Sequence, residues 1–168
     1  MGEAEDNLER RLANWKDGKM SLEETADIAR EIGKRGLLSG VPLLLKLLQH
    51  TDCIVRYNAI LSLAFELHQK SATEKLLSIA ANDEDDDCRR GAAAGLGHLF
   101  QNSRDRRIIA ALGNLALNDP DEYVRRSSYK YLLIVNGVSN DEHLSLLRDT
   151  SIEVDPEVVE QILSAVRS

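Results

Sequence analysis

A short pattern recurs along the chain and constrains its fold more than any other feature. Asp121, Val124 and Arg125 stand in the order Asp-x-x-Val-Arg, after an acidic turn and before a helical pattern of apolar residues. Related segments start at three further positions: Asp52, Asp85 and Asp155. Successive copies are therefore 33, 36 and 34 residues apart, a period that is typical of stacked helix pairs. The sequence predicts one helical unit repeated along the chain.

Aligning the copies produces columns of residues at helical spacing. The apolar position three residues after each Asp is occupied by Val55, Cys88, Val124 and Val158. The next two columns, each four residues further on, are Ala59, Ala92, Ser128 and Ile162, and then Leu63, Leu96, Leu132 and Val166. Positions i, i+4 and i+8 share one face of a helix, so these columns are expected to form its buried side. The Asp that precedes each helix is expected to cap its first turn.

A second apolar segment at helical spacing precedes each acidic turn, so each unit is expected to be a helix, a turn and a helix. At the N-terminal end, Ser21 and Glu24 form a capping-box pattern for a further helix. We predict an all-α solenoid of about five helix pairs in a single domain over residues 1–168. The predicted units are an N-terminal capping pair at 7–40 and repeats at 41–70, 73–102, 106–137 and 141–168.

Composition and charge narrow the classes of partner. The net charge is −7. This charge argues against general nucleic-acid binding, because such binding needs many Lys and Arg contacts to phosphates. An acidic chain suits a basic protein partner better. The two cysteines, Cys53 and Cys88, are too few for a disulfide framework, and no secretory signal or membrane span is evident. We therefore expect a cytoplasmic protein with no membrane partner.

The Asp-x-x-Val-Arg turns, together with Ala-Ala-Ala-Gly-Leu-Gly at residues 92–97, resemble the HEAT repeats of the short bacterial type. The resemblance covers residues 41–168 well and 7–40 loosely. It implies a right-handed solenoid whose second helices line the concave surface. In HEAT-like proteins the Arg tends to pair with the Asp column of a neighbouring repeat. The resemblance thus implies a structural ladder of Asp52, Arg56, Asp85, Arg89, Asp121 and Arg125.

The residues beside the Arg column are expected to lie on the concave surface. They are basic and aromatic, and these types anchor many protein interfaces. The predicted binding residues are Tyr57, Leu61, Phe65, Arg90, His98, Arg126, Lys130 and Ile134.

No catalytic or metal-binding constellation emerges from the sequence. Some HEAT-like enzymes bind iron through His-Glu dipeptides, but this chain has only the reverse order, Glu142-His143. The glycines at 91, 95 and 97 follow no strand and precede no Lys-Ser or Lys-Thr, so they fit helix packing better than phosphate binding. We expect no catalytic residue, no metal and no cofactor.

These observations favour non-enzymatic protein binding through the concave face. One specific hypothesis is a bacterial immunity protein that binds and neutralises a basic toxin domain. Two alternatives stay open because the HEAT-like scaffold serves many roles. One is a subunit of a lyase that attaches bilin chromophores, and the other is a DNA-binding HEAT-like protein.

Overall fold

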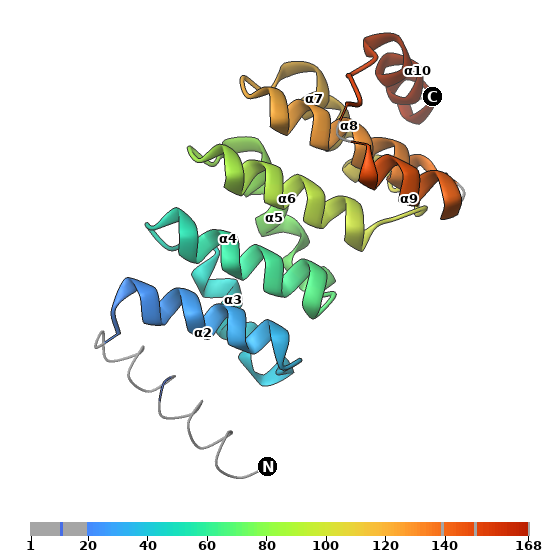
Figure 1. Cartoon of the computed structure of the whole chain (residues 1–168). Coiled ribbons are helices and arrows are strands. Elements are labelled where there is room, and N and C mark those ends of the chain that lie inside the picture. Colours follow the sequence, from blue (N-terminus) through green and yellow to red (C-terminus); the bar gives the residue numbers. More distant parts are fainter. Residues whose placement is uncertain (1–10, 12–19, 139, 150, 168) are drawn as a thin grey trace. The chain divides into compact units, whose positions relative to one another are not determined.

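A computed structural model of the chain describes residues 11, 20–138, 140–149 and 151–167. All regular elements in this part of the chain are helical, which confirms the all-α prediction. The helices group into two compact units, Met1–Leu67 and His68–Ser168. Figure 1 shows the helices of each unit.

The first unit contains helices joined by short turns. In order they are α2 (Leu22–Lys34), the 3₁₀ turn η1 (Leu38–Gly40), α3 (Val41–Leu47), α4 (Cys53–Leu61) and the π-helical turn η2 (Ser62–Glu66). Ser21 caps α2, and the Glu24 side chain accepts from the Ser21 N–H at 2.8 Å, so the predicted capping box is confirmed. Of the predicted N-terminal capping pair at 7–40, residues 7–10 and 12–19 lie outside the described residues.

Helix α2 packs closely on α4 and η2 because Gly33 has no side chain where it meets Ser62. The Ser62 hydroxyl donates to the Ala29 carbonyl at 2.8 Å, which links α2 to η2 in the interior of the unit.

The second unit repeats a helix–turn–helix arrangement. Its elements are η3 (Lys70–Ala72), α5 (Thr73–Asn82), α6 (Asp86–Leu99), α7 (Arg106–Asn118), α8 (Glu122–Asn136), α9 (Asn140–Arg148) and α10 (Pro156–Arg167). Helices α6 and α8 lie side by side, and each also packs on the helix that precedes it (Figure 1). The predicted core columns of α6 and α8 are fully buried: Cys88, Ala92, Leu96, Val124, Ser128 and Leu132.

The acidic turns start these helices as predicted. Asp85 accepts from the Cys88 N–H at 2.9 Å, and Asp121 accepts from the Val124 N–H at 3.0 Å. These bonds satisfy donors that a helix cannot pair internally.

The last helix pair departs from the predicted register. Helix α10 packs mainly on α7, and its buried side chains are Val159 and Leu163 rather than the predicted Val158 and Ile162. The physical reason is a hollow on α7, where Gly113 has no side chain and Leu163 fills the space. Helix α9 is the element that follows α8, and none of its described side chains is buried.

Candidate functional site

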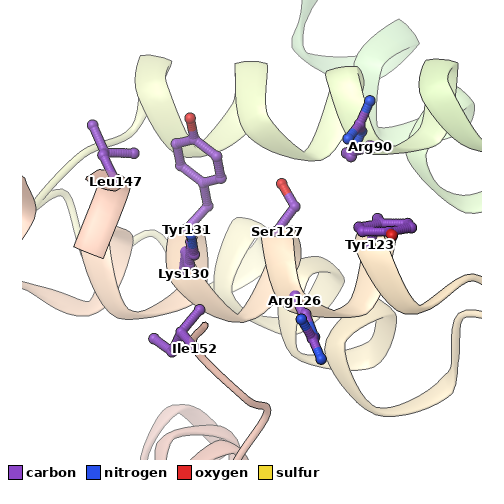
Figure 2. A pocket seen from close by; sticks show the side chains of 8 residues that line it. All are labelled: Arg90, Tyr123, Arg126, Ser127, Lys130, Tyr131, Leu147 and Ile152. Atoms are coloured by element: carbon purple, nitrogen blue, oxygen red, sulfur yellow. The ribbon is translucent and has the colours of Figure 1, made fainter. Parts of the chain in front are cut away.

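A surface cavity of about 340 Å³ opens along α8 in the second unit (Figure 2). Its walls come from α6, from α8, from α9 and from the segment between α9 and α10. We call it the α8 groove, and its lining residues are Arg90, Tyr123, Arg126, Ser127, Lys130, Tyr131, Leu147 and Ile152.

Three residues at a spacing of four form the side of the groove nearest α6. Tyr123, Ser127 and Tyr131 lie on one face of α8 (Figure 2). The Tyr131 ring packs over Gly97 of α6, where an added Cβ would collide with it. Burial raises the pKa of the Tyr131 phenol. Tyr123, at the other end, leaves 64% of its surface exposed.

Arg126 joins α8 to the segment that precedes α10. Its guanidinium forms an ion pair with Glu122 at 2.5 Å and a second with Glu153. The Nε atom of the same side chain is buried and meets no acceptor among the described residues. Arg126 therefore holds the groove wall in place and keeps one donor that is still to be satisfied.

The other two cations of the groove have local partners as well. Arg90 forms an ion pair with Asp87 on its own helix, and the Lys130 ammonium donates to the Asp149 carbonyl. The Arg90–Asp87 pair is largely exposed, and exposed ion pairs contribute little to folding stability.

The structure brings three of the eight predicted binding residues into this groove: Arg90, Arg126 and Lys130. His98 also lies on α6, but its imidazole contacts that of His68. Ile134 is fully buried, so its prediction as a contact residue is wrong. The loop after α6 covers this end of α8, since the Asn102 N–H donates to the Ile134 carbonyl at 2.9 Å.

The remaining three predicted residues belong to the first unit. Tyr57 and Leu61 lie on α4 and Phe65 lies in η2, and all three are half-buried. They stay predicted binding residues of that unit.

Five of the lining residues were not predicted from the sequence: Tyr123, Ser127, Tyr131, Leu147 and Ile152. The first three carry a signal that could have been found, because they repeat every four residues beside the Arg126–Lys130 stripe. Leu147 and Ile152 carry no such signal in the sequence, because their position depends on how the last helix pair packs against α8.

The predicted Asp–Arg ladder is replaced by a different network. Arg89 holds a carboxylate of the following repeat with two hydrogen bonds, of 2.9 and 3.0 Å, but this carboxylate belongs to Asp119 and not to Asp121. Asp121 caps α8 instead, and Asp119 also accepts from the Asp121 N–H at 2.9 Å. Hydrogen bonding to Asp119 is the main cause that raises the pKa of Arg89.

The other two arginines of the column bind turn carbonyls. Arg125 donates to the carbonyls of Asp119 and Pro120, and Arg56 donates to those of His50 and Thr51. The column is thus engaged with the chain itself, and Arg56 and Arg89 are buried. Buried arginines of this kind are not available to a phosphate backbone, which weighs against the DNA-binding alternative.

Two further properties bear on chemistry. In the part of the chain that the structure describes, no three His, Cys, Asp or Glu side chains are grouped so that they could hold a metal ion. None of the described helices combines the length and the apolar character that a membrane span requires.

Repeated helix pairs with a structured turn between the two helices of each pair define a helical scaffold. The family model described as HEAT repeats matches residues 20–97 and 73–167, and the chain belongs to this family. HEAT repeats commonly act as protein-interaction modules, and the family is generally a non-enzymatic scaffold. No curated protein matches the chain.

Proposed function

We propose that the protein is a non-enzymatic binding module and that the α8 groove receives a segment of another protein. The observation that carries the proposal is the grouping of three cations, two tyrosines and two apolar side chains around one open cavity. Tyr and Arg are enriched among the residues that dominate binding energies, and an apolar centre with a polar rim is typical of interfaces.

The chemistry of the groove favours a segment that carries a carboxylate beside an apolar side chain. Arg90, Arg126 and Lys130 offer charge-assisted hydrogen bonds, whereas Leu147 and Ile152 offer an apolar wall. The carboxylate would take the place that Asp87 or Glu153 holds in the free protein.

The test is a pair of matched charge-reversal variants. Arg90→Glu with Lys130→Glu reverses two charges in the groove, and Arg106→Glu with Arg107→Glu reverses two exposed charges on α7. A photo-crosslinking amino acid at Tyr123, which is 64% exposed, first captures the partner from the native host. Binding of that partner should fall at least about 30-fold for the groove variant, as for loss of an interface anchor. It should stay near the wild-type value for the α7 variant.

Equal affinities of the two variants for the crosslinked partner would exclude the groove as the binding site. Circular dichroism shows whether each variant remains helical. Tyr123→Ala then separates the aromatic from the charged contribution, with an expected loss of about 1–2 kcal/mol in binding free energy.

The finer hypothesis is an immunity protein for a basic toxin domain. Its support is the scaffold class together with the net charge of −7, which would steer a basic partner towards the chain. The expected result is that the protein blocks the toxin at equimolar concentration, with an association rate that falls as salt rises. A partner that is acidic, or that has no toxic activity, would sink this hypothesis and leave the binding module intact.

A further inference from the structure

Two histidines outside the α8 groove meet at the surface of the second unit. His68 begins this unit, and His98 lies in the last turn of α6. Their Nε2 atoms are 3.2 Å apart, and their ring centroids are 5.1 Å apart. The two residues are 30 positions apart in the sequence, so the tertiary fold and not a local turn brings them together.

The backbone at His68 follows the turn geometry of the repeat. Its φ of 53° lies in the left-handed region, which His adopts more readily than most residues with a side chain. Asn102 has a φ of 56° in the turn after α6, so this conformation belongs to the turns that end the second helix of a pair.

The separation of the two nitrogen atoms matches that of two ligands on one metal ion. Zn²⁺ binds imidazole nitrogen at about 2.0–2.1 Å in tetrahedral geometry, which places two such nitrogens about 3.3–3.4 Å apart. The observed 3.2 Å differs from this by only a small amount, so the two Nε2 atoms already have about the separation that one metal ion requires.

A helix end and a lysine near the two histidines bear on the charge of a bound metal ion. His98 lies at the C-terminal end of α6, where the partial negative charge of the helix favours a cation. The nearest cation in sequence, Lys70, is placed over the Phe100 ring, with its nitrogen 4.8 Å from the ring centre. Its charge is thus already held by an aromatic face.

We propose that His68 and His98 form a two-imidazole site for a late first-row divalent metal ion, with zinc as the ion that tetrahedral geometry suits. Imidazole is a ligand that Zn²⁺, Ni²⁺ and Cu²⁺ all accept, and two water molecules complete the coordination. Without metal, the Nε2–H of one ring donates to the Nε2 of the other. Binding moves that proton to Nδ1 of the same ring, so both neutral rings present an Nε2 lone pair and no net proton is released.

Isothermal titration with zinc chloride in metal-free buffer tests the site. Wild type and His50→Gln should bind one zinc ion per chain, because His50 lies in the first unit and its imidazole accepts from the Asp52 N–H. His68→Gln and His98→Gln should each weaken binding by at least about tenfold, since loss of even an outer-shell partner costs about 10–100-fold. Equal zinc affinity in all four proteins would overturn the proposal.

A second measurement uses only the wild-type protein. Nuclear magnetic resonance of the imidazole nitrogens should show the Nε2 resonances of His68 and His98 shifting together on zinc addition, and the ring that donated from Nε2 should change to the form protonated at Nδ1. The His50 resonances should not move, and a chelator should reverse the change. Zinc-dependent shifts that leave the His68 and His98 nitrogens unchanged would place the metal elsewhere and reject the site.

Discussion

Two buried serines show how the same residue type can have opposite effects on stability. Ser128 on α8 is fully buried, and its hydroxyl has no hydrogen-bond partner within the described structure. Ser62 is buried as well, but its hydroxyl donates to the Ala29 carbonyl at 2.8 Å. A buried hydroxyl without a partner lowers stability, whereas a paired one adds to it.

We expect Ser128→Ala to leave the free energy of unfolding unchanged or to raise it by up to about 1 kcal/mol. Alanine already occupies the equivalent position of α6, at Ala92, so the smaller side chain fits the packing. Urea unfolding followed by circular dichroism measures the difference.

Ser62→Ala is the matched control and should lower stability by about 1 kcal/mol, because it removes a satisfied hydrogen bond. Equal losses for the two variants would mean that the Ser128 hydroxyl is paired in solution, for example by a buried water molecule.

Among the single substitutions, we expect replacement of Arg89 to lower the free energy of unfolding most. Its guanidinium pairs with Asp119, whose side chain is only 3% exposed, and it also donates to the Asp83 carbonyl at 3.0 Å. Arg89→Met leaves this carboxylate buried without its counter-ion, which should lower the free energy of unfolding by about 3–5 kcal/mol. Thermal unfolding provides the measurement.

Arg107→Met is the control for Arg89→Met. It breaks an ion pair of similar length, 2.8 Å to Glu74, but both side chains are mostly exposed. Its effect should be within the error of the measurement. A loss for Arg107→Met as large as that for Arg89→Met would contradict the role assigned to burial.

At the scale of the helices, the contact between α6 and α8 depends on Gly97. A Cβ at this position would collide with the ring and with the Cβ of Tyr131, so rotation of the ring cannot relieve the contact. Gly→Ala in a helix normally raises stability by about 1 kcal/mol. Gly97→Ala should instead lower it by about 1–3 kcal/mol through overpacking.

Gly113→Ala is the comparison for Gly97→Ala. The nearest atom there is Cδ2 of Leu163, at 2.7 Å, which is the far end of a flexible side chain. The loss of stability should therefore be smaller for Gly113→Ala than for Gly97→Ala. Thermal unfolding of both variants measures the two changes in stability. An increase in stability for Gly97→Ala would contradict the close packing of α6 on α8.

The helices of the second unit also show what the sequence could reveal. Buried columns and capping residues repeat locally at helical spacing, and Val124 and Asp121 are where the pattern predicts them. The face used by α10 depends on the hollow beside Gly113, which is a tertiary feature without a local signal. The choice of Asp119 over Asp121 as partner of Arg89 is likewise set by the three-dimensional path of the turn.

At the scale of the whole molecule, repeat arrays are stabilised mainly by contacts between neighbours, so an element that buries little against its neighbours is held least firmly. No described side chain of α9 is buried, and this helix supplies Leu147 to the α8 groove. We expect the amides of α9 to exchange with deuterium much faster than those of α6 and α8. Hydrogen–deuterium exchange with mass spectrometry measures the rates peptide by peptide.

The exchange experiment also connects stability with binding. A partner that occupies the α8 groove should slow exchange in α9, because it would order a wall that is loosely held in the free protein. Slow exchange in α9 of the free protein, at the rate of α8, would contradict this expectation.

Arg89 and Arg125 bind backbone carbonyls of the turns, so some side chains of these turns can be changed without loss of the bonds. Arg89 binds the backbone carbonyls of Asp83 and Glu84, and Arg125 binds that of Pro120, so the side chains at 84 and 120 are not the acceptors of these bonds. A library that randomises residues 84 and 120 while it keeps Asp83 and Asp119 should retain the fold. The turns inside the helix pairs thus offer positions from which new specificities can be selected without rebuilding the helices.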